Sequence, residues 1–470
     1  MLTTPLTKLY VYPIKGLRPI PLQHAQLTPQ GIKYDRTFML YHVKTKASDD
    51  GSVELKKMQL SSHPQCALFE QTILSREDQN GGSKEVLVKW HAPAPAAGQG
   101  AEEELELLEQ AESAKLKRLE AETITVELDP PPRIEELERV EVDLHSSPTT
   151  CYKVGEEYDR WFSERFGFSV MFVYLGDGKR QILGTSLLPP ATSATHSHAS
   201  SRRQSGQSTP QRLQPQQQSG GGWLSTLTSL TSWFPTVPIS VPGFIAIQGE
   251  REEEEEEDQE QQQPDKKPWI TFTDVAPLLI TSESSLSNLS ARLTPESPEE
   301  STKPTTHPQV PQVPQVPMYK MRPNLVVDGK GEEAWAEDYW GELVVTSRST
   351  SSTRRSTSNT APTTTNKKTK TKTKLHLTGN CARCTSLNVD YDTGKPAKGE
   401  MGAVLKKLMK DRRVDPGMKW SPVFGRYAFV GESAIVEAEE EEGREVWISV
   451  GDEVQVTRRN EERTVMDWPF

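Results

Sequence analysis

The segment KLYVYPIKG at residues 8–16 decides the fold class of this 470-residue chain. Its apolar and β-branched residues indicate a strand that ends in a turn. After the break LTPQG at residues 27–31, RTFMLYHV at residues 36–43 resumes the same character, and ALFEQTIL (67–74) and KEVLVKW (84–90) continue it. The chain therefore begins as an all-β domain.

Strand-like segments also recur further along the chain, separated by turn residues. Only a few segments have helical spacing, such as YDRWFSERFG at residues 158–167. The later strands are expected in PWITFTDVAPLLITS (268–282), RPNLVVDG (322–329), GELVV (341–345), SPVFGRYAFV (421–430) and VWISVGDEVQV (446–456). Many short strands and few helices predict a mainly β protein with some α structure and β-barrel architecture.

Four polar blocks interrupt this pattern, and they explain why apolar residues make up only 34% of the chain. Such blocks bury too little apolar surface to offset chain entropy, so we interpret them as insertions. The first is acidic and helix-forming; the others are predicted to be disordered. They lie at about 92–122, 191–267, 295–318 and 347–373.

Two of these blocks carry a second interpretation. Residues 223–234 place Trp and Leu at helical spacing, which suits packing on the chain's own domain or, as an alternative, peripheral membrane contact. The block at 347–373 is basic, which indicates a solvated segment or loose pairing with the acidic run from Glu250.

Charge and cysteine content narrow the functional classes. A formal net charge of −11 argues against binding nucleic acid through phosphate neutralisation. Four cysteines are too few for a disulfide scaffold, and MLTTPLTKLYVYPIKG lacks the blocks of a signal peptide. No run of about 18 apolar residues occurs, so no transmembrane segment is expected. These features predict an intracellular, cytoplasmic protein.

The tract Cys381-Ala382-Arg383-Cys384 is the most informative for chemistry. A zinc site would need two further ligands, and a thioredoxin-like pair would open a helix, whereas Thr385 begins a strand-like segment. If the tract is itself a strand, its two sulfurs face opposite sides. This predicts one working thiolate, as a nucleophile or a soft metal ligand, and one bystander; a buried structural cysteine is the alternative.

Three basic residues recur at expected strand ends. They are Lys15, Arg36 and Arg322. Singly, each is typical of a solvated side chain. Together they would suit an anionic ligand, because arginine donates two hydrogen bonds at once and lysine acts as a point charge.

These motifs occur in the same order in MOSC-domain proteins. The chain resembles the family of the mitochondrial amidoxime reducing component, which pairs a MOSC N-terminal β-barrel domain with a MOSC domain. The resemblance predicts these domains at residues 1–190 and 268–460, and it skips the four polar blocks. The motifs that carry it are YPIKG, GIKYDRTFML, TDVAPLLITSESSLSNL, RPNLVVDG with AWAEDYW, GNCARCTSLNVDYDTG, SPVFGRYAFV and ISVGDEV.

The resemblance implies a molybdenum cofactor, a molybdenum–molybdopterin, held by one protein cysteine at the position of Cys384. Ala382 is expected to line the same pocket, and Asp390 to orient solvent or substrate, with capping of the following turn as the alternative. The cofactor contacts implied by the family are Lys15, Gly16, Arg36, Asp274, Val275, Ala276, Arg322 and Asn324.

The activity implied is reduction of N-hydroxylated compounds such as amidoximes, with electrons from a cytochrome b5 and its NADH-dependent reductase. The alternative is a non-catalytic cofactor carrier, like the C-terminal part of molybdenum cofactor sulfurases. This chain has no room for the pyridoxal-phosphate domain of those enzymes, so pyridoxal phosphate is not expected. A non-enzymatic scaffold is a third hypothesis, which the intact cysteine tract disfavours.

Overall fold

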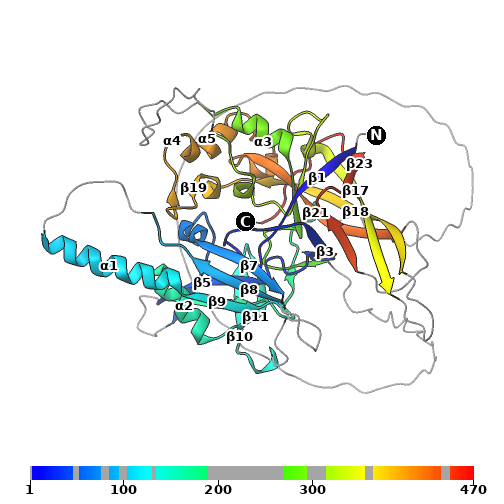
Figure 1. Ribbon diagram of the computed structural model, residues 1–470. Coiled ribbons are helices and arrows are strands. Elements are labelled where there is room, and N and C mark those ends of the chain that lie inside the picture. Colours follow the sequence, from blue (N-terminus) through cyan, green and yellow to red (C-terminus); the bar gives the residue numbers. More distant parts are fainter. Residues whose placement is uncertain are drawn as a thin grey trace, which may run out of the picture. The chain divides into compact units, whose positions relative to one another are not determined.

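A computed structural model describes most of the chain outside the polar blocks (Figure 1). Strands dominate, and helices are short apart from α1, as the sequence predicts. Residues 1–191 and 267–470 group into one compact unit. The described ranges are 3–45, 52–75, 84–94, 103–129, 134–188, 268–293, 314–354, 364–435 and 445–469.

A closed barrel forms the centre of this unit. Its strands run in the order β16-β15-β21-β18-β17-β23-β1, and β16 pairs back with β1, so the ring closes and removes its sheet edges. Among the described strands of this barrel, β15–β16 is the one parallel pair. The barrel strands are β1 (Thr3–Val11), β15 (Leu278–Ser282), β16 (Leu325–Val327), β17 (Trp340–Arg354), β18 (Thr364–Ala382), β21 (Val423–Ile435) and β23 (Glu453–Arg459).

The first strand belongs to this barrel. β1 pairs with β16 and β23, more than 300 residues away along the chain, and its last residues, Leu9–Val11, also pair with β2 (Ile20–Leu22) on the side opposite β16. The predicted division near residue 190 therefore does not separate two independent sheets. Leu6, Leu9 and Val11 of β1 lie in the main hydrophobic core, and the irregularity between Leu6 and Lys8 brings Leu6 and Leu9 to the same face despite their odd spacing.

The remaining strands, most of them N-terminal, form smaller sheets beside the barrel. β10-β11-β12-β5-β6 make one sheet, β7-β8-β9 a second, and β22-β3-β4 a third. Their bounds are β3 (His24–Thr28), β4 (Gly31–Ile32), β5 (Phe38–Thr45), β6 (Val53–Lys57), β7 (Phe69–Ser75), β8 (Lys84–Trp90), β9 (Thr123–Glu127), β10 (Arg139–Leu144), β11 (Ser147–Lys153), β12 (Val170–Tyr174) and β22 (Val446–Ser449). The short pairs are β13 (Arg180–Gln181) with β14 (Trp269–Ile270) and β19 (Val389–Asp390) with β20 (Lys395–Pro396).

Helices cover these sheets. α2 (Glu156–Phe166) begins after Gly155 and ends at Gly167, whose φ of +78° suits a left-handed helix cap. Its aromatic side chains pack on Phe69 and Phe172, for example with Phe162 at centroid distances of 5.6 Å and 5.2 Å. The other helices are α1 (Glu103–Ala121), α3 (Glu283–Ser290), α4 (Gly399–Gly402) and α5 (Val404–Met409). No helix in the described ranges is both long and apolar enough to cross a membrane.

The polar blocks behave differently from one another. In the first block, α1 confirms the expected helix, yet Leu119 is buried, so the end of the helix packs on the core. The described part of the third block, residues 314–318, also packs, because Val316 and Met318 are buried. Residues 191–267, including 223–234, lie outside the described residues.

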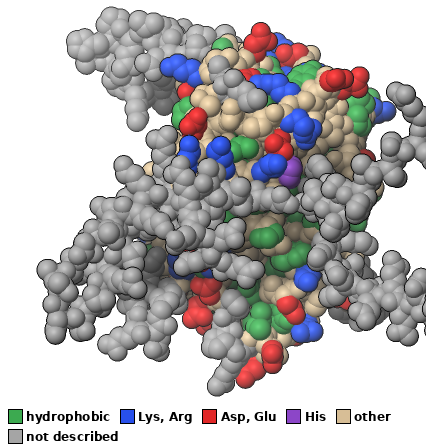
Figure 2. Space-filling view, turned by 90° about the vertical axis from the view of Figure 1, so that its right-hand side faces the viewer, with side chains coloured by type: hydrophobic (Ala, Val, Ile, Leu, Met, Phe, Trp, Pro, Cys, Tyr) green, Lys and Arg blue, Asp and Glu red, His purple; other side chains and the backbone are tan. Residues whose placement is uncertain are grey.

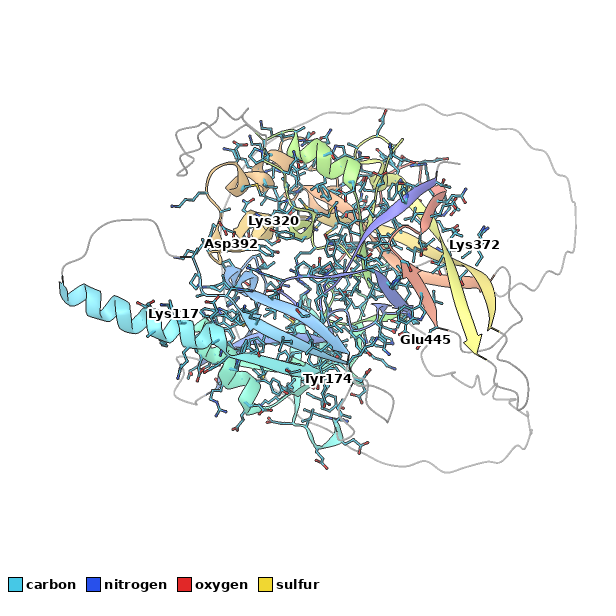
Figure 3. The ribbon with its side chains drawn as sticks, in the orientation of Figure 1. Lys117, Tyr174, Lys320, Lys372, Asp392 and Glu445 are labelled. Carbon is cyan, nitrogen blue, oxygen red and sulfur yellow. The ribbon has the colours of Figure 1, made fainter. Side chains whose placement is uncertain are left out.

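The fourth block differs from its prediction. Residues 347–354 and 364–373 continue β17 and β18 as an antiparallel ribbon, with Arg348 opposite Lys370 (Figure 1, right). The repeat KTKTKTK has the period of two that a strand requires, and threonine favours strands, so composition alone misjudged it. Lys372 points outward from this ribbon (Figure 3), and Figure 2 shows cationic and acidic side chains interspersed on this side of the molecule.

Candidate active site

One cavity of about 250 Å³ gathers most of the predicted site residues. They arrive from separate segments: the turn after β1, the loop before β5, the loop before β15, the loop before β16, and the end of β18. The predicted residues that line the cavity are Lys15, Gly16, Arg36, Asp274, Ala276, Arg322, Asn324, Ala382 and Cys384.

Two arginines stand on the faces of one tyrosine. The guanidinium carbons of Arg36 and Arg322 lie 4.5 Å and 4.4 Å from the ring centroid of Tyr12, which is fully buried. Both arginines have φ of +52°, a left-handed conformation that is strained for a residue with a side chain. Cation–π contacts with Tyr12 compensate that strain and hold two like charges close together.

Hydrogen bonds fix the same cluster. Asn324 Oδ1 accepts from Arg36 Nη1 at 3.3 Å and from the backbone N–H of Leu279 at 3.1 Å. The Tyr12 hydroxyl donates to the Pro323 carbonyl at 3.1 Å. Arg36 also forms an ion pair with the buried Asp35. Arg322 Nη1 donates to the Leu17 carbonyl at 2.9 Å. The positions of both guanidinium groups are therefore set before any ligand binds.

Lys15 is buried against an acidic partner. Its Nζ lies 2.5 Å from Asp274 Oδ1, and burial lowers the pKa of Lys15 to about 8, although Asp274 opposes the shift. Burial alone would raise the pKa of Asp274, yet Lys15 and His145 hold it well below its usual range. Gly16, with φ of +92°, supplies the left-handed turn that places Lys15 here.

The two sulfurs of the Cys-x-x-Cys tract have different surroundings. β18 ends at Ala382 and Cys384 precedes a short 3-10 turn, so the predicted continuous strand is wrong and both cysteines line the cavity. Cys384 is exposed, with its Sγ 3.2 Å from Ser386 Oγ. Cys381 is buried, and burial raises the pKa of its thiol, which lies 3.2 Å from the Tyr427 hydroxyl. The accessible thiol is that of Cys384.

Two predicted residues lie away from this cavity. Val275 is fully buried in the apolar cluster beneath it, together with Ile270. Asp390 caps a turn: its Oδ1 accepts from the backbone N–H groups of Asp392 at 2.8 Å and Thr393 at 3.1 Å. That is the structural alternative considered for Asp390, and the structure does not bring its carboxylate to the cavity wall. Figure 3 labels Asp392 at this turn.

The sequence did not indicate several residues that line the cavity or support its wall. Tyr12 lies inside YVYPIKG, where it is indistinguishable from a core tyrosine, and His145 lies in a turn without Gly or Asn. Thr273 and Arg383 also line the cavity. Within the described part of the chain, Thr273 Oγ1 and Arg383 Nε are buried and have no hydrogen-bond partner.

The cavity fits a polar, anionic ligand. Four cationic side chains line it (Lys15, Arg36, Arg322 and Arg383), whereas Asp274 is the carboxylate among the lining residues. Asp35 does not line the cavity and pairs with Arg36. Buried polar atoms rarely remain unpaired, so the free Thr273 and Arg383 atoms point to a ligand that completes their hydrogen bonds. The accessible thiol of Cys384, once deprotonated, can bind a soft metal. These groups fit the anionic, metal-bearing cofactor that the family resemblance implies.

The Asp274–Lys15 pair predicts an acid-sensitive fold. Because the pKa of Asp274 is below its usual 3.8 in the folded protein, its stabilising contribution is present above about pH 4 and is lost as the pH falls below that value. We expect the melting temperature of the wild type to fall faster than that of Asp274→Asn between pH 5 and pH 3. Parallel melting curves for the two proteins over this range would contradict the assignment.

Comparison with known proteins gives two domain matches. Residues 3–93 match the MOSC N-terminal beta barrel domain, and residues 267–455 match the MOSC domain. Among curated proteins, the mitochondrial amidoxime-reducing component 1 of Homo sapiens is 28% identical over 165 residues, which is 34% of this chain and 34% of that protein. The match thus spans about a third of the length of this relative.

Proposed function

Because this chain belongs to the MOSC-domain proteins and carries the MOSC N-terminal domain as well, we propose that it binds a molybdenum cofactor and reduces N-hydroxylated compounds of the amidoxime type. One observation carries the proposal: an exposed thiol and the cations Lys15, Arg36 and Arg322, from distant segments, line the same cavity. The relative named above reduces amidoximes according to its name, which supports the choice of substrate.

Different residues of the cavity would bind different parts of the cofactor. Cys384 would supply the protein thiolate to molybdenum, and Arg36 and Arg322 would bind the pterin phosphate through paired N–H donors. The loop at Asp274 and Ala276 would offer backbone groups to the polar pterin edge, and Thr273 and Arg383 would complete their hydrogen bonds on the ligand. When bound, the cofactor supplies two-electron chemistry that accepts an oxygen atom. Val275 and Asp390 have no place in this proposal.

The electron donors are proposed from the family resemblance. A cytochrome b5 would deliver electrons one at a time, and an NADH-dependent flavin reductase would then reduce the oxidised cytochrome again. The cavity is bounded by apolar side chains as well, among them Met321, Leu279 and Met466. Such a wall suits the organic part of an N-hydroxylated substrate and limits water around the reacting bond.

The decisive experiment compares expression hosts with and without molybdenum-cofactor synthesis. Bound molybdenum and pterin are quantified first, and benzamidoxime reduction is then assayed with cytochrome b5, its reductase and NADH. We expect stoichiometric metal only from the competent host, and turnover that depends on all three components. Cofactor retention without turnover would favour the carrier alternative, and protein without metal from either host would refute cofactor binding.

Tyr12 offers a test of the binding geometry that needs no catalysis. Tyr12→Leu removes the ring that Arg36 and Arg322 both contact, and loss of cation–π contacts of about 1–2 kcal/mol should lower pterin retention roughly tenfold. Tyr12→Phe keeps the ring and loses only the hydrogen bond to Pro323, so it should retain the cofactor. Equal retention in both variants would show that the ring does not position the arginines.

A further inference from the structure

A strained turn carries a histidine to the cavity. His145 and Ser146 alone join β10 to β11, because Leu144 pairs directly with Ser147. Their φ values of +58° and +62° are those of a type I′ hairpin turn, which normally selects Asn or Gly at both positions. Neither residue is of that type. Strain of this kind persists where the surrounding structure enforces it, and it is concentrated at functional sites.

Hydrogen bonds with neighbouring residues hold His145 and Ser146 in this left-handed conformation. The Trp468 indole N–H donates to the His145 carbonyl at 2.8 Å, which ties the turn to the C-terminal segment. Asp143 Oδ1 accepts from the Ser146 backbone N–H at 3.3 Å. The His145 imidazole itself lines the cavity and its side chain is only 14% exposed.

The contacts of the imidazole define its orientation. Lys57 Nζ lies 3.3 Å from Nδ1, and a lysine ammonium can only donate, so Nδ1 accepts and the ring proton belongs on Nε2. Nε2 lies 3.4 Å from Asp274 Oδ1. The Gln59 side-chain nitrogen lies 3.1 Å from the same Nε2. A ring proton on Nε2 therefore requires the Gln59 amide to be turned over so that its oxygen accepts, since the two amide atoms can exchange places.

These contacts lead from the outer strand β6 to the cavity, where the Asp274 side chain is half-exposed and Lys15 is buried. Lys57 is half-exposed on β6, the outermost strand of its sheet. From there the chain of contacts runs through His145 to Asp274, and from Asp274 to the buried Lys15. Each member can gain or release a proton, and His145 is the member whose ordinary pKa lies closest to neutrality.

The proposed reaction needs such a route. Reduction of an amidoxime, R–C(=NOH)NH2, breaks the N–O bond and consumes two electrons and two protons, giving the amidine R–C(=NH)NH2 and one water. The one-electron haem donor supplies the electrons through the cofactor, but the protons come from solvent. We propose that His145 relays these protons from the Lys57 side to the Asp274–Lys15 pair; this inference rests on the proposed function.

The charged groups facing His145 are consistent with a neutral, proton-exchanging ring. Burial lowers the pKa of His145, and Lys57 on β6 and Lys15 after β1 lower it further, whereas Asp274 before β15 raises it. Asp143 lies on the same hairpin. A ring that is mostly neutral at physiological pH can take a proton on Nδ1 and release one from Nε2.

The test uses the cofactor-loaded protein. His145→Asn tolerates the left-handed turn but cannot relay a proton, so we expect kcat to fall about 10- to 100-fold, with molybdenum content unchanged and the melting temperature at or above that of the wild type. In His145→Gly, added imidazole should restore part of the lost rate. His24→Gln, on the exposed surface of β3, is the matched control and should be unaffected.

A second readout needs no cofactor. Imidazole nitrogen NMR on the metal-free protein should show the Nε2–H tautomer of His145, and Asp274→Asn should lower the pKa of that ring. An active wild type together with an equally active His145→Asn variant overturns the relay alone, as does an Nδ1–H tautomer. A cofactor-loaded wild type that reduces no N-hydroxylated compound overturns the proposed function, and the relay with it.

Discussion

Cys384→Ala is expected to lose nearly all of its molybdenum, whereas Cys381→Ala keeps it. The reason is accessibility: Cys384 is exposed at the cavity, while Cys381 is buried against Tyr427 and Arg383 with a raised thiol pKa. A cysteine binds a metal as a thiolate, and the metal must be able to reach its sulfur. We expect molybdenum per protein to fall by more than about tenfold in the first variant and by less than about twofold in the second.

The comparison between the two cysteines supplies its own control. Both variants lose one sulfur within the same tract, so a general disturbance of the loop would lower the metal content of both. Metal is measured by mass spectrometry and pterin by fluorescence after oxidation, on protein purified in parallel. Equal losses would show that both sulfurs matter and would reject the single-thiolate proposal; a Cys384→Ala protein with full metal would remove Cys384 as the ligand.

The sequence predicted the segments of the site better than their geometry. Lys15, Arg36, Arg322 and Cys384 could be selected because their motifs occur in a fixed order, and the structure brings them to one cavity. The strand alternation used for the cysteines failed because β18 ends at Ala382. A period of two holds only within a strand, and the end of a strand is the least predictable part of it.

Local sequence patterns also could not predict which distant strands pair with each other. The period of β1 predicts a strand, but nothing within residues 3–11 shows that it closes a barrel with residues 325–327 and 453–455. The left-handed backbone conformations of Arg36, Arg322 and His145 could not be predicted from the sequence for a related reason. Without Gly or Asn at these positions the sequence carries no turn signal, because tertiary contacts rather than local preference impose the backbone.

Asp338→Ala is expected to lower the free energy of unfolding by about 3–5 kcal/mol, which corresponds to roughly 5–10 °C in melting temperature. Asp338 is fully buried and accepts two hydrogen bonds from Arg412 Nη2, at 2.7 Å and 2.8 Å, and one from Arg463 Nε at 2.8 Å. Arg412 is itself only 4% exposed at its side chain. Removing the carboxylate leaves that guanidinium buried without its counter-charge.

An exposed pair in the same domain provides the matched control. Arg292 donates from Nη1 and Nη2 to the two oxygens of Asp411, at 2.6 Å and 3.0 Å, whereas Arg412 donates from Nη2 alone. The Asp411 side chain is 58% exposed. Asp411→Ala should therefore cost no more than about 1 kcal/mol. Asp338→Asn, which keeps an acceptor oxygen but not the charge, should fall between the two alanine variants. Chemical denaturation of the three proteins measures these differences in the free energy of unfolding. Equal midpoints for Asp338→Ala and Asp411→Ala would contradict the prediction. They would mean that the cost of desolvating Arg412 already cancels the attraction of the buried pair.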